Sequence, residues 1–320
     1  MSREVSRAGA TEAHSEHVLD QPNLRMAMRH DSDFWRRAAA FGARRGPAWF
    51  LRYSPPIIGV MWCAALPKAR RAVEQNLVRV RGDRGKLRNT IDAARTFATF
   101  AGCLAETLAA GSRNEIQVHS VLEGEENFRD ALADGHGMVI ATSHTAGWEA
   151  TGSSLTEGLG VEVVVAMQRE RDAAARELQD RAREARGVRV VHVGADPLEA
   201  LPLLSHLKKG GAVALQIDRP VQGMRMQDVR LFGVPAKIPE GPFRLAQLSG
   251  APIVPVFSAR VGYRRYFVRA EKPLRVPRRA MENDVRKIAQ SLANTFENFV
   301  REHPTQWLTF EPLTGDAPAP

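Results

Sequence analysis

The sequence has few cysteines and no uninterrupted apolar segment long enough to cross a bilayer. Its two cysteines, Cys63 and Cys103, stand in no CxxC pair and no Cys/His cluster, so neither a disulfide framework nor a zinc site is expected. A spanning helix needs about 20 nearly continuous apolar residues. The most apolar early stretch, residues 47–66, is interrupted by Arg52 and by Pro55-Pro56. The first residues are polar and no apolar core follows them, so no secretory signal peptide is expected.

The chain also lacks a GxSxG nucleophile elbow, and neither cysteine stands beside a histidine. No serine or cysteine nucleophile is therefore marked by a motif. The 45 Lys and Arg residues outnumber the 36 Asp and Glu residues, giving a formal net charge of +9. Such an excess favours an anionic partner. No nucleic-acid-binding motif accompanies the charge, so an anionic membrane surface or an acidic protein is expected rather than a nucleic acid.

Four regions follow one another along the chain. Residues 1–30 are polar without periodicity, which predicts disorder. Residues 31–115 have apolar residues at helical spacing, which predicts an N-terminal helical extension. Residues 116–312 alternate between strand and helix patterns and form the predicted core, and 313–320 are a tail.

The apolar stretch in the N-terminal extension is expected to lie in the headgroup region of a membrane, as an interfacial anchor rather than a spanning helix. Its membrane-facing candidates are Trp49, Phe50, Tyr53, Ile57, Ile58 and Trp62. The alternative, a hairpin buried in the protein core, explains the same residues equally well.

The core pattern predicts an α/β fold with a largely parallel central sheet flanked by helices. Strands are expected at residues 138–142, 161–167, 188–193, 212–217, 253–258 and 263–270. Helices are expected at residues 125–134, 172–186, 197–209, 244–249 and 283–302. Active sites of such sheets gather at the carboxyl ends of the strands, which points to the residues after Thr142 and Ile217.

A histidine and a glutamate bracket a small turn directly after the first buried strand. His144 and Glu149 are five residues apart and would not share one face of an ideal helix. With His144 in a loop and Glu149 in the first turn of a helix, the carboxylate can reach Nδ1 and leave Nε2 free as a general base. The alternative is that both residues only cap a helix.

Residues 144–149 resemble the HxxxxD/E signature of the lysophospholipid (glycerolipid) acyltransferase superfamily. Five further segments agree in order with its bacterial lipid A late acyltransferase branch (lauroyl and myristoyl transferases) and with the related mycobacterial mannoside acyltransferases. These segments are residues 70–77, 231–236, 241–246, 250–256 and 303–307, and the resemblance covers roughly residues 33–312. The ordered set is far more specific than one HxxxxE alone.

The resemblance implies direct acyl transfer. In the family, the histidine deprotonates a hydroxyl (or amine) of a lipid or glycolipid acceptor, which then attacks the thioester of acyl carrier protein or acyl-CoA. The resemblance implies no acyl-enzyme, no metal and no cofactor, with the thioester as a co-substrate. Asp218 stands where relatives carry an acidic block, although their Pro-Glu-Gly-Thr form is absent here. Asp218 therefore either orients His144 in place of Glu149 or forms a surface ion pair with Arg219.

The resemblance also suggests substrate contacts. Arg169 matches an arginine that relatives use near the polar head of the acceptor, although a solvated charge is an equally good interpretation. Further candidates near the base are Arg219, Ser143, Thr145 and Gly147. Attachment to the cytoplasmic face of an inner membrane, peripheral or monotopic, is expected. The competing hypotheses are a lipid ester hydrolase and a catalytically idle membrane-associated scaffold.

Overall fold

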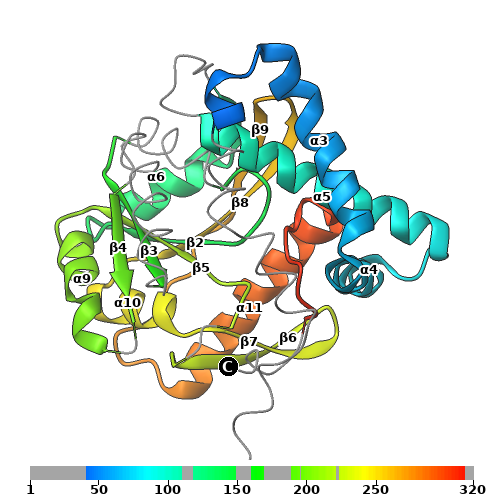
Figure 1. The fold of residues 1–320 in the computed structure, drawn as a ribbon. Helices are drawn as coiled ribbons and strands as arrows, with labels where there is room; N and C mark the ends of the chain where they lie inside the picture. Colours follow the sequence, from blue (N-terminus) through cyan, green and yellow to red (C-terminus); the bar gives the residue numbers. More distant parts are fainter. Residues whose placement is uncertain are drawn as a thin grey trace, which may run out of the picture.

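A computed structural model describes residues 41–109, 118–148, 160–168, 189–194, 196–220 and 223–313. A seven-stranded sheet lies at its centre (Figure 1), with the strand order β1-β9-β8-β2-β5-β3-β4. The strands are β1 His119–Glu123, β2 Met138–Thr142, β3 Val163–Gln168, β4 Arg189–Val193, β5 Ala212–Gln216, β8 Ile253–Gly262 and β9 Arg265–Ala270.

The five strands from β8 to β4 are mutually parallel, and β9 and β1 run the other way at one edge. The predicted largely parallel sheet is thus confirmed. Every residue of β2 is buried, as expected for a central strand covered on both faces. The first strand, β1, was not predicted, because only five residues with alternating exposure mark it.

Helices cover both faces of the sheet (Figure 1). One face packs against α9 Leu201–Lys208, α10 Gly241–Ser249 and α11 Glu282–Glu302, and the other packs against α6 Glu125–Ala133. Short 3-10 turns, η1 Pro197–Ala200 and η2 Pro304–Gln306, precede α9 and follow α11. The centre of the larger core is aromatic: Phe296 of α11 lies 5.5 Å from Phe257 and 5.6 Å from Trp307, measured between ring centroids.

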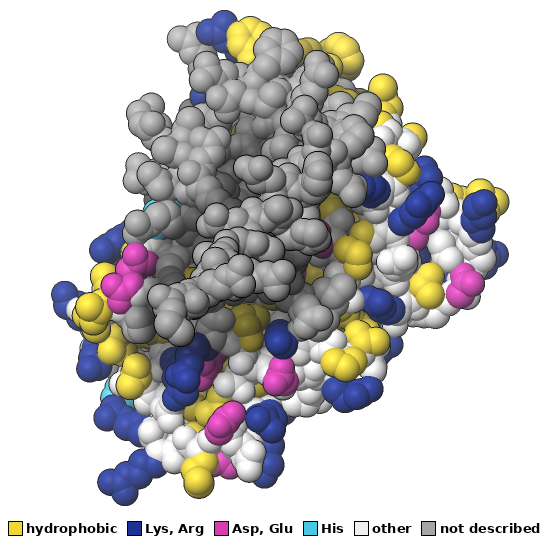
Figure 2. Space-filling model, turned by 60° about the horizontal axis from the view of Figure 1, so that its bottom comes forward, with side chains coloured by type: hydrophobic (Ala, Val, Ile, Leu, Met, Phe, Trp, Pro, Cys, Tyr) yellow, Lys and Arg dark blue, Asp and Glu magenta, His cyan; other side chains and the backbone are white. Residues whose placement is uncertain are grey.

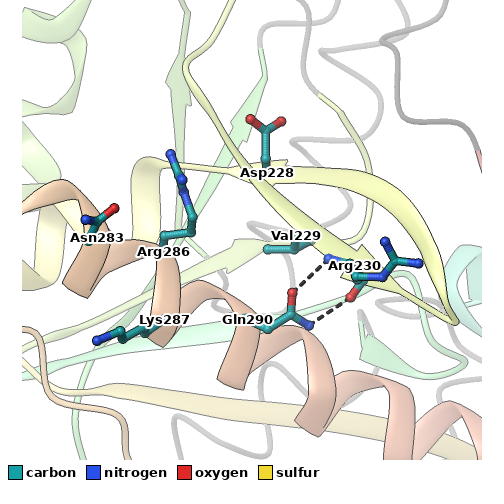
Figure 3. A pocket seen from close by; sticks show the side chains of 7 residues that line it. All are labelled: Asp228, Val229, Arg230, Asn283, Arg286, Lys287 and Gln290. Atoms are coloured by element: carbon teal, nitrogen blue, oxygen red, sulfur yellow. Dashed lines mark hydrogen bonds between the residues drawn. The ribbon is translucent and has the colours of Figure 1, made fainter.

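A two-stranded hairpin that the sequence pattern did not reveal packs on α11. It consists of β6 Met226–Leu231 and β7 Val234–Pro239. Gln290 of α11 accepts from the backbone N–H of Arg230 at 2.8 Å and donates to its carbonyl at 2.9 Å (Figure 3), so one side chain pairs with the edge of β6. A cavity of about 520 Å³ opens beside this contact, between β6 and the start of α11.

The N-terminal extension is helical, as predicted. It consists of α3 Ala48–Ala65, α4 Pro67–Arg81 and α5 Lys86–Ala109. The apolar stretch forms one helix that continues through Pro55 and Pro56, so the alternative of a buried hairpin is wrong. The two prolines cannot donate the backbone hydrogen bonds of their positions, and the helix packs against α5. Among the described residues, no helix combines the length and the apolar character that crossing a membrane requires.

Most of the predicted membrane-facing side chains are exposed on one helix, α3. The exposed ones are Trp49, Tyr53, Ile57, Ile58 and Trp62. Phe50 differs from them because it is half-buried in a small cluster around Leu51 and Ala109. Neighbouring α5 adds Leu87, Ile91, Phe100 and Leu104 to the exposed apolar residues.

Gly59 allows the close packing of α3 against α5. A methyl group on its Cα would collide with the backbone of Phe97 and Ala98. We therefore expect Gly59→Ala to lower the free energy of unfolding by about 1–3 kcal/mol through overpacking. Urea denaturation measures this change. The neighbouring exposed residue provides the matched control, since Val60→Ala should change stability by less than about 0.5 kcal/mol. Equal effects of the two substitutions would contradict the close approach.

Candidate active site

The register of two neighbouring parallel strands brings His144 and Asp218 together. Thr142, the last residue of β2, pairs with Gln216, the last residue of β5. Just beyond this pair, the backbone N–H of Ile217 donates to the carbonyl of Thr142 at 2.9 Å. His144 and Asp218 each follow their strand end by two residues, so the two side chains leave the sheet at the same level. This is the carboxyl edge that the sequence indicated.

The carboxylate of Asp218 accepts three hydrogen bonds. Its Oδ1 lies 2.9 Å from Nδ1 of His144 and accepts from the backbone N–H of His144 at 3.0 Å. Its Oδ2 accepts from Nε1 of Trp307 at 2.9 Å. Because an ionised carboxylate can only accept, Nδ1 of His144 carries the proton and Nε2 is left without one in the neutral ring.

Burial and charge fix the state of this pair. The side chain of Asp218 is fully buried, while 25% of the His144 side chain is exposed. Burial raises the pKa of the Asp218 carboxyl, but His144, the nearby Arg219 and the Trp307 hydrogen bond outweigh burial and hold that pKa well below its usual range. Asp218 is thus a permanent anion beneath an imidazole that reaches the surface.

The segment after α11 completes the site from the other end of the chain. The carbonyl of His144 accepts from the backbone N–H of Leu308, and the carbonyl of Gln306 accepts from the backbone N–H of Ala146, both at 2.8 Å. Trp307, between them, stacks on Phe232 at the tip of the β6–β7 hairpin, with 5.5 Å between ring centroids. No local pattern predicts the hydrogen bond between Trp307 and Asp218, because the two residues are 89 positions apart.

The predicted substrate contacts next to the base are close to it but well buried. Ser143 and Thr145 have no exposed surface, and Oγ1 of Thr145 accepts from the backbone N–H of Ser258 at 3.3 Å. Gly147 has a φ of +95° and lies against the ring of Tyr266, so a side chain at this position would be strained and would collide. Their roles in substrate binding stay predictions.

Arg219 does not form the isolated surface pair with Asp218 that was one alternative. One of its Nη atoms donates to the carbonyl of Leu308 at 2.9 Å, and its Nε is buried without a hydrogen-bond partner among the described residues. Glu149 and Arg169, the other two predicted site residues, lie outside the described residues. Within the described ranges, no group of three or more His, Cys, Asp or Glu side chains is arranged to hold a metal ion.

Comparisons with known proteins identify a family and relatives of this chain. The model of the family described as bacterial lipid A biosynthesis acyltransferases matches residues 47–313. Two similar relatives are phosphatidylinositol mannoside acyltransferases of Mycobacterium tuberculosis (strain H37Rv), 27% identical over 61% of this chain, and of Mycolicibacterium smegmatis, 27% identical over 57%. The matched segments span 60% and 58% of those relatives.

The depressed pKa of Asp218 predicts a specific pH dependence of stability. A carboxyl group whose pKa is lower in the folded chain stabilises the fold above its unfolded pKa of about 3.9, and this contribution fades as the pH falls below that value. We expect Asp218→Asn to be least stable relative to wild type at neutral pH, and the difference to shrink below about pH 4. Urea denaturation at several pH values measures it. A difference that grows in acid would contradict the assignment.

Proposed function

The chain belongs to the bacterial lipid A biosynthesis acyltransferase family, and from that premise we propose that it transfers a fatty acyl chain from a thioester donor to a hydroxyl of a lipid or glycolipid acceptor. The observation that carries the proposal is the bond between Nδ1 of His144 and buried Asp218, at the carboxyl edge of the sheet. The related mannoside acyltransferases make a glycolipid hydroxyl the first acceptor class to test.

The reaction follows from the state of the pair. Nε2 of His144 removes the proton of the acceptor hydroxyl as the oxygen attacks the thioester carbonyl. When the tetrahedral intermediate collapses, the carbon–sulfur bond breaks, and the imidazolium returns its proton to the departing thiolate. Asp218 stays ionised throughout and stabilises the imidazolium, as the buried carboxylate of a catalytic triad does. General base catalysis of this kind is typically worth about 10²–10⁴-fold.

The two cysteines favour direct transfer over an acyl-enzyme. Burial raises the pKa of Cys103 to about 12, so its thiol stays protonated and is a poor nucleophile. Burial also raises the pKa of Cys63. The donor, acyl carrier protein or acyl-CoA, is then a co-substrate that leaves as a free thiol.

Three unsatisfied polar atoms beside the pair support an oxygen-rich substrate. Oγ of Ser143, Nε of Arg219 and Nε2 of Gln216 are buried without hydrogen-bond partners among the described residues. Buried polar groups normally have partners, and exceptions gather at functional sites. We propose Ser143 and Arg219 as contacts of the acceptor headgroup or the acyl carbonyl. Thr145 and Gly147 shape the same loop, and Arg169 is proposed to bind the headgroup.

The exposed apolar surface of α3 and α5 supports binding to a membrane. Figure 2 shows hydrophobic side chains at the upper and right margins of that view, with Lys and Arg among them. Exposed arginines on this part of the chain include Arg52, Arg84, Arg88 and Arg95. Apolar residues that enter the headgroup region, surrounded by cations, suit an anionic lipid surface. We propose peripheral attachment to the cytoplasmic face of an inner membrane, where lipid precursors and acyl thioesters are both available.

Replacing the base tests the proposed function. In cells that lack the gene, wild type should restore one lipid class carrying an additional acyl group, and His144→Ala should restore at least about a hundredfold less. Mass spectrometry of total lipids measures this, and the mass difference identifies the acceptor and the chain length. Circular dichroism checks that the variant folds. Restoration of that lipid by His144→Ala at the wild-type level would overturn the proposal.

Matched isosteric substitutions distinguish the roles of the two candidate carboxylates, Asp218 and Glu149. Asp218→Asn removes the charge that holds the Nδ1 proton of His144, so we expect acyl transfer to fall by about 10²-fold or more. Acyl transfer by the Glu149→Gln variant should fall much less if Asp218 is the orienting group. The same lipid comparison measures both. The reverse order of losses would assign the orienting role to Glu149.

A further inference from the structure

The loop that carries His144, residues 143–148 and here called the catalytic loop, contacts α5 and β9. The backbone of Gly147 donates a hydrogen bond to the thiol of Cys103 on α5. The ring of Tyr266 on β9 lies directly against Gly147, three residues after His144. Only glycine combines this close approach with a φ of +95°. The position of Tyr266 therefore limits where the loop, and with it His144, can lie.

Tyr266 is in turn fixed by a buried carboxylate on α5. The Tyr266 hydroxyl donates to Oε2 of Glu106 at 2.5 Å. Oε1 of Glu106 accepts from Nε and Nη2 of Arg260 at 3.1 and 2.6 Å, and from the backbone N–H of Arg264 at 3.2 Å. Burial raises the pKa of Tyr266 above its usual range, so its hydroxyl stays protonated and remains the donor.

The same cluster reaches the loop by a second route. The backbone N–H of Arg260, on β8, donates to Oε1 of Gln306 at 2.9 Å. The carbonyl of Gln306 accepts from the backbone N–H of Ala146 at 2.8 Å. The carboxylate of Glu106 is only 3% exposed and the Arg260 side chain 15%, so little water competes with these bonds. Two chains of contacts thus run from Glu106 to the residues that follow His144.

We propose that Glu106 is a positioning residue for acyl transfer, which sets the place of the catalytic loop through Tyr266 and Arg260. This inference rests on the proposed function, in which His144 of this loop is the general base and its position affects the rate of acyl transfer. Displacing a base by about 1 Å can cost 10²-fold in rate. A purely structural ion pair, in contrast, would affect stability without changing turnover by the folded enzyme.

The experiment compares Tyr266→Phe with a control substitution on α5, the helix that carries Glu106. Tyr266→Phe keeps the ring against Gly147 but removes its bond to Glu106. Asp92→Asn disrupts another buried ion pair of α5, with Arg81, which has similar exposure. Transfer from palmitoyl-CoA to phosphatidylinositol mannoside in anionic vesicles serves as the assay, at a temperature where all variants are folded.

We expect kcat to fall about tenfold in Tyr266→Phe with KM within about twofold of wild type, and both constants to be unchanged in Asp92→Asn. Glu106→Gln removes the charge that pairs with Arg260 and should lower kcat at least as far. If Glu106→Gln does not fold, Tyr266→Phe alone decides. A kcat of wild-type size in Tyr266→Phe, or an equal loss in Asp92→Asn, would overturn the proposal.

Hydrogen–deuterium exchange provides a measurement that needs no turnover. Residues 143–148 should exchange faster in Tyr266→Phe than in wild type, whereas in Asp92→Asn they should exchange as in wild type. If wild type itself does not transfer the acyl group, the proposed function fails with these substrates, and exchange alone then decides whether Glu106 positions the loop. Unchanged exchange of residues 143–148 in Tyr266→Phe would contradict the inference in either case.

Discussion

The site depends on one buried anion, the carboxylate of Asp218. It accepts hydrogen bonds from the backbone N–H of His144, from Nδ1 of the His144 ring and from Nε1 of Trp307. A buried carboxylate is costly unless its lone pairs are satisfied. The parallel pairing of β2 with β5 and the return of the C-terminal segment both provide those partners. Folding of the whole core is therefore what assembles the base.

Helix α5 contributes both to the proposed lipid-facing surface and to the support of the catalytic loop. Its exposed face carries Phe100 and Leu104, which belong to the proposed lipid-facing surface. Its buried face carries Cys103 and Glu106, which contact the catalytic loop directly or through Tyr266. The position of the base is thus linked to the surface that would hold the substrate.

The spacing of apolar residues along the sequence predicted those strands and helices whose burial makes that spacing regular. The apolar run of β2 and the helical spacing of α5 could be identified because burial imposes their periodicity. His144 and Asp218 could be identified as candidates because each follows a buried strand. The β6–β7 hairpin could not, because polar Gln227 lies on the buried side of β6 and β7 contains two prolines, Pro235 and Pro239, which weaken the strand pattern. The Trp307–Asp218 bond and the inward turn of Phe50 are products of tertiary packing, which no local periodicity encodes.

The tautomer of His144 tests the central claim most directly. NMR of protein labelled with ¹⁵N-histidine distinguishes a protonated ring nitrogen from an unprotonated one, and loss of the signal in His144→Ala assigns it. Above about pH 8, where an ordinary imidazole is neutral, the account predicts a proton on Nδ1, held by Asp218, and none on Nε2. A proton on Nε2, or a spectrum that Asp218→Asn leaves unchanged, would contradict the assignment of His144 as a base oriented by Asp218.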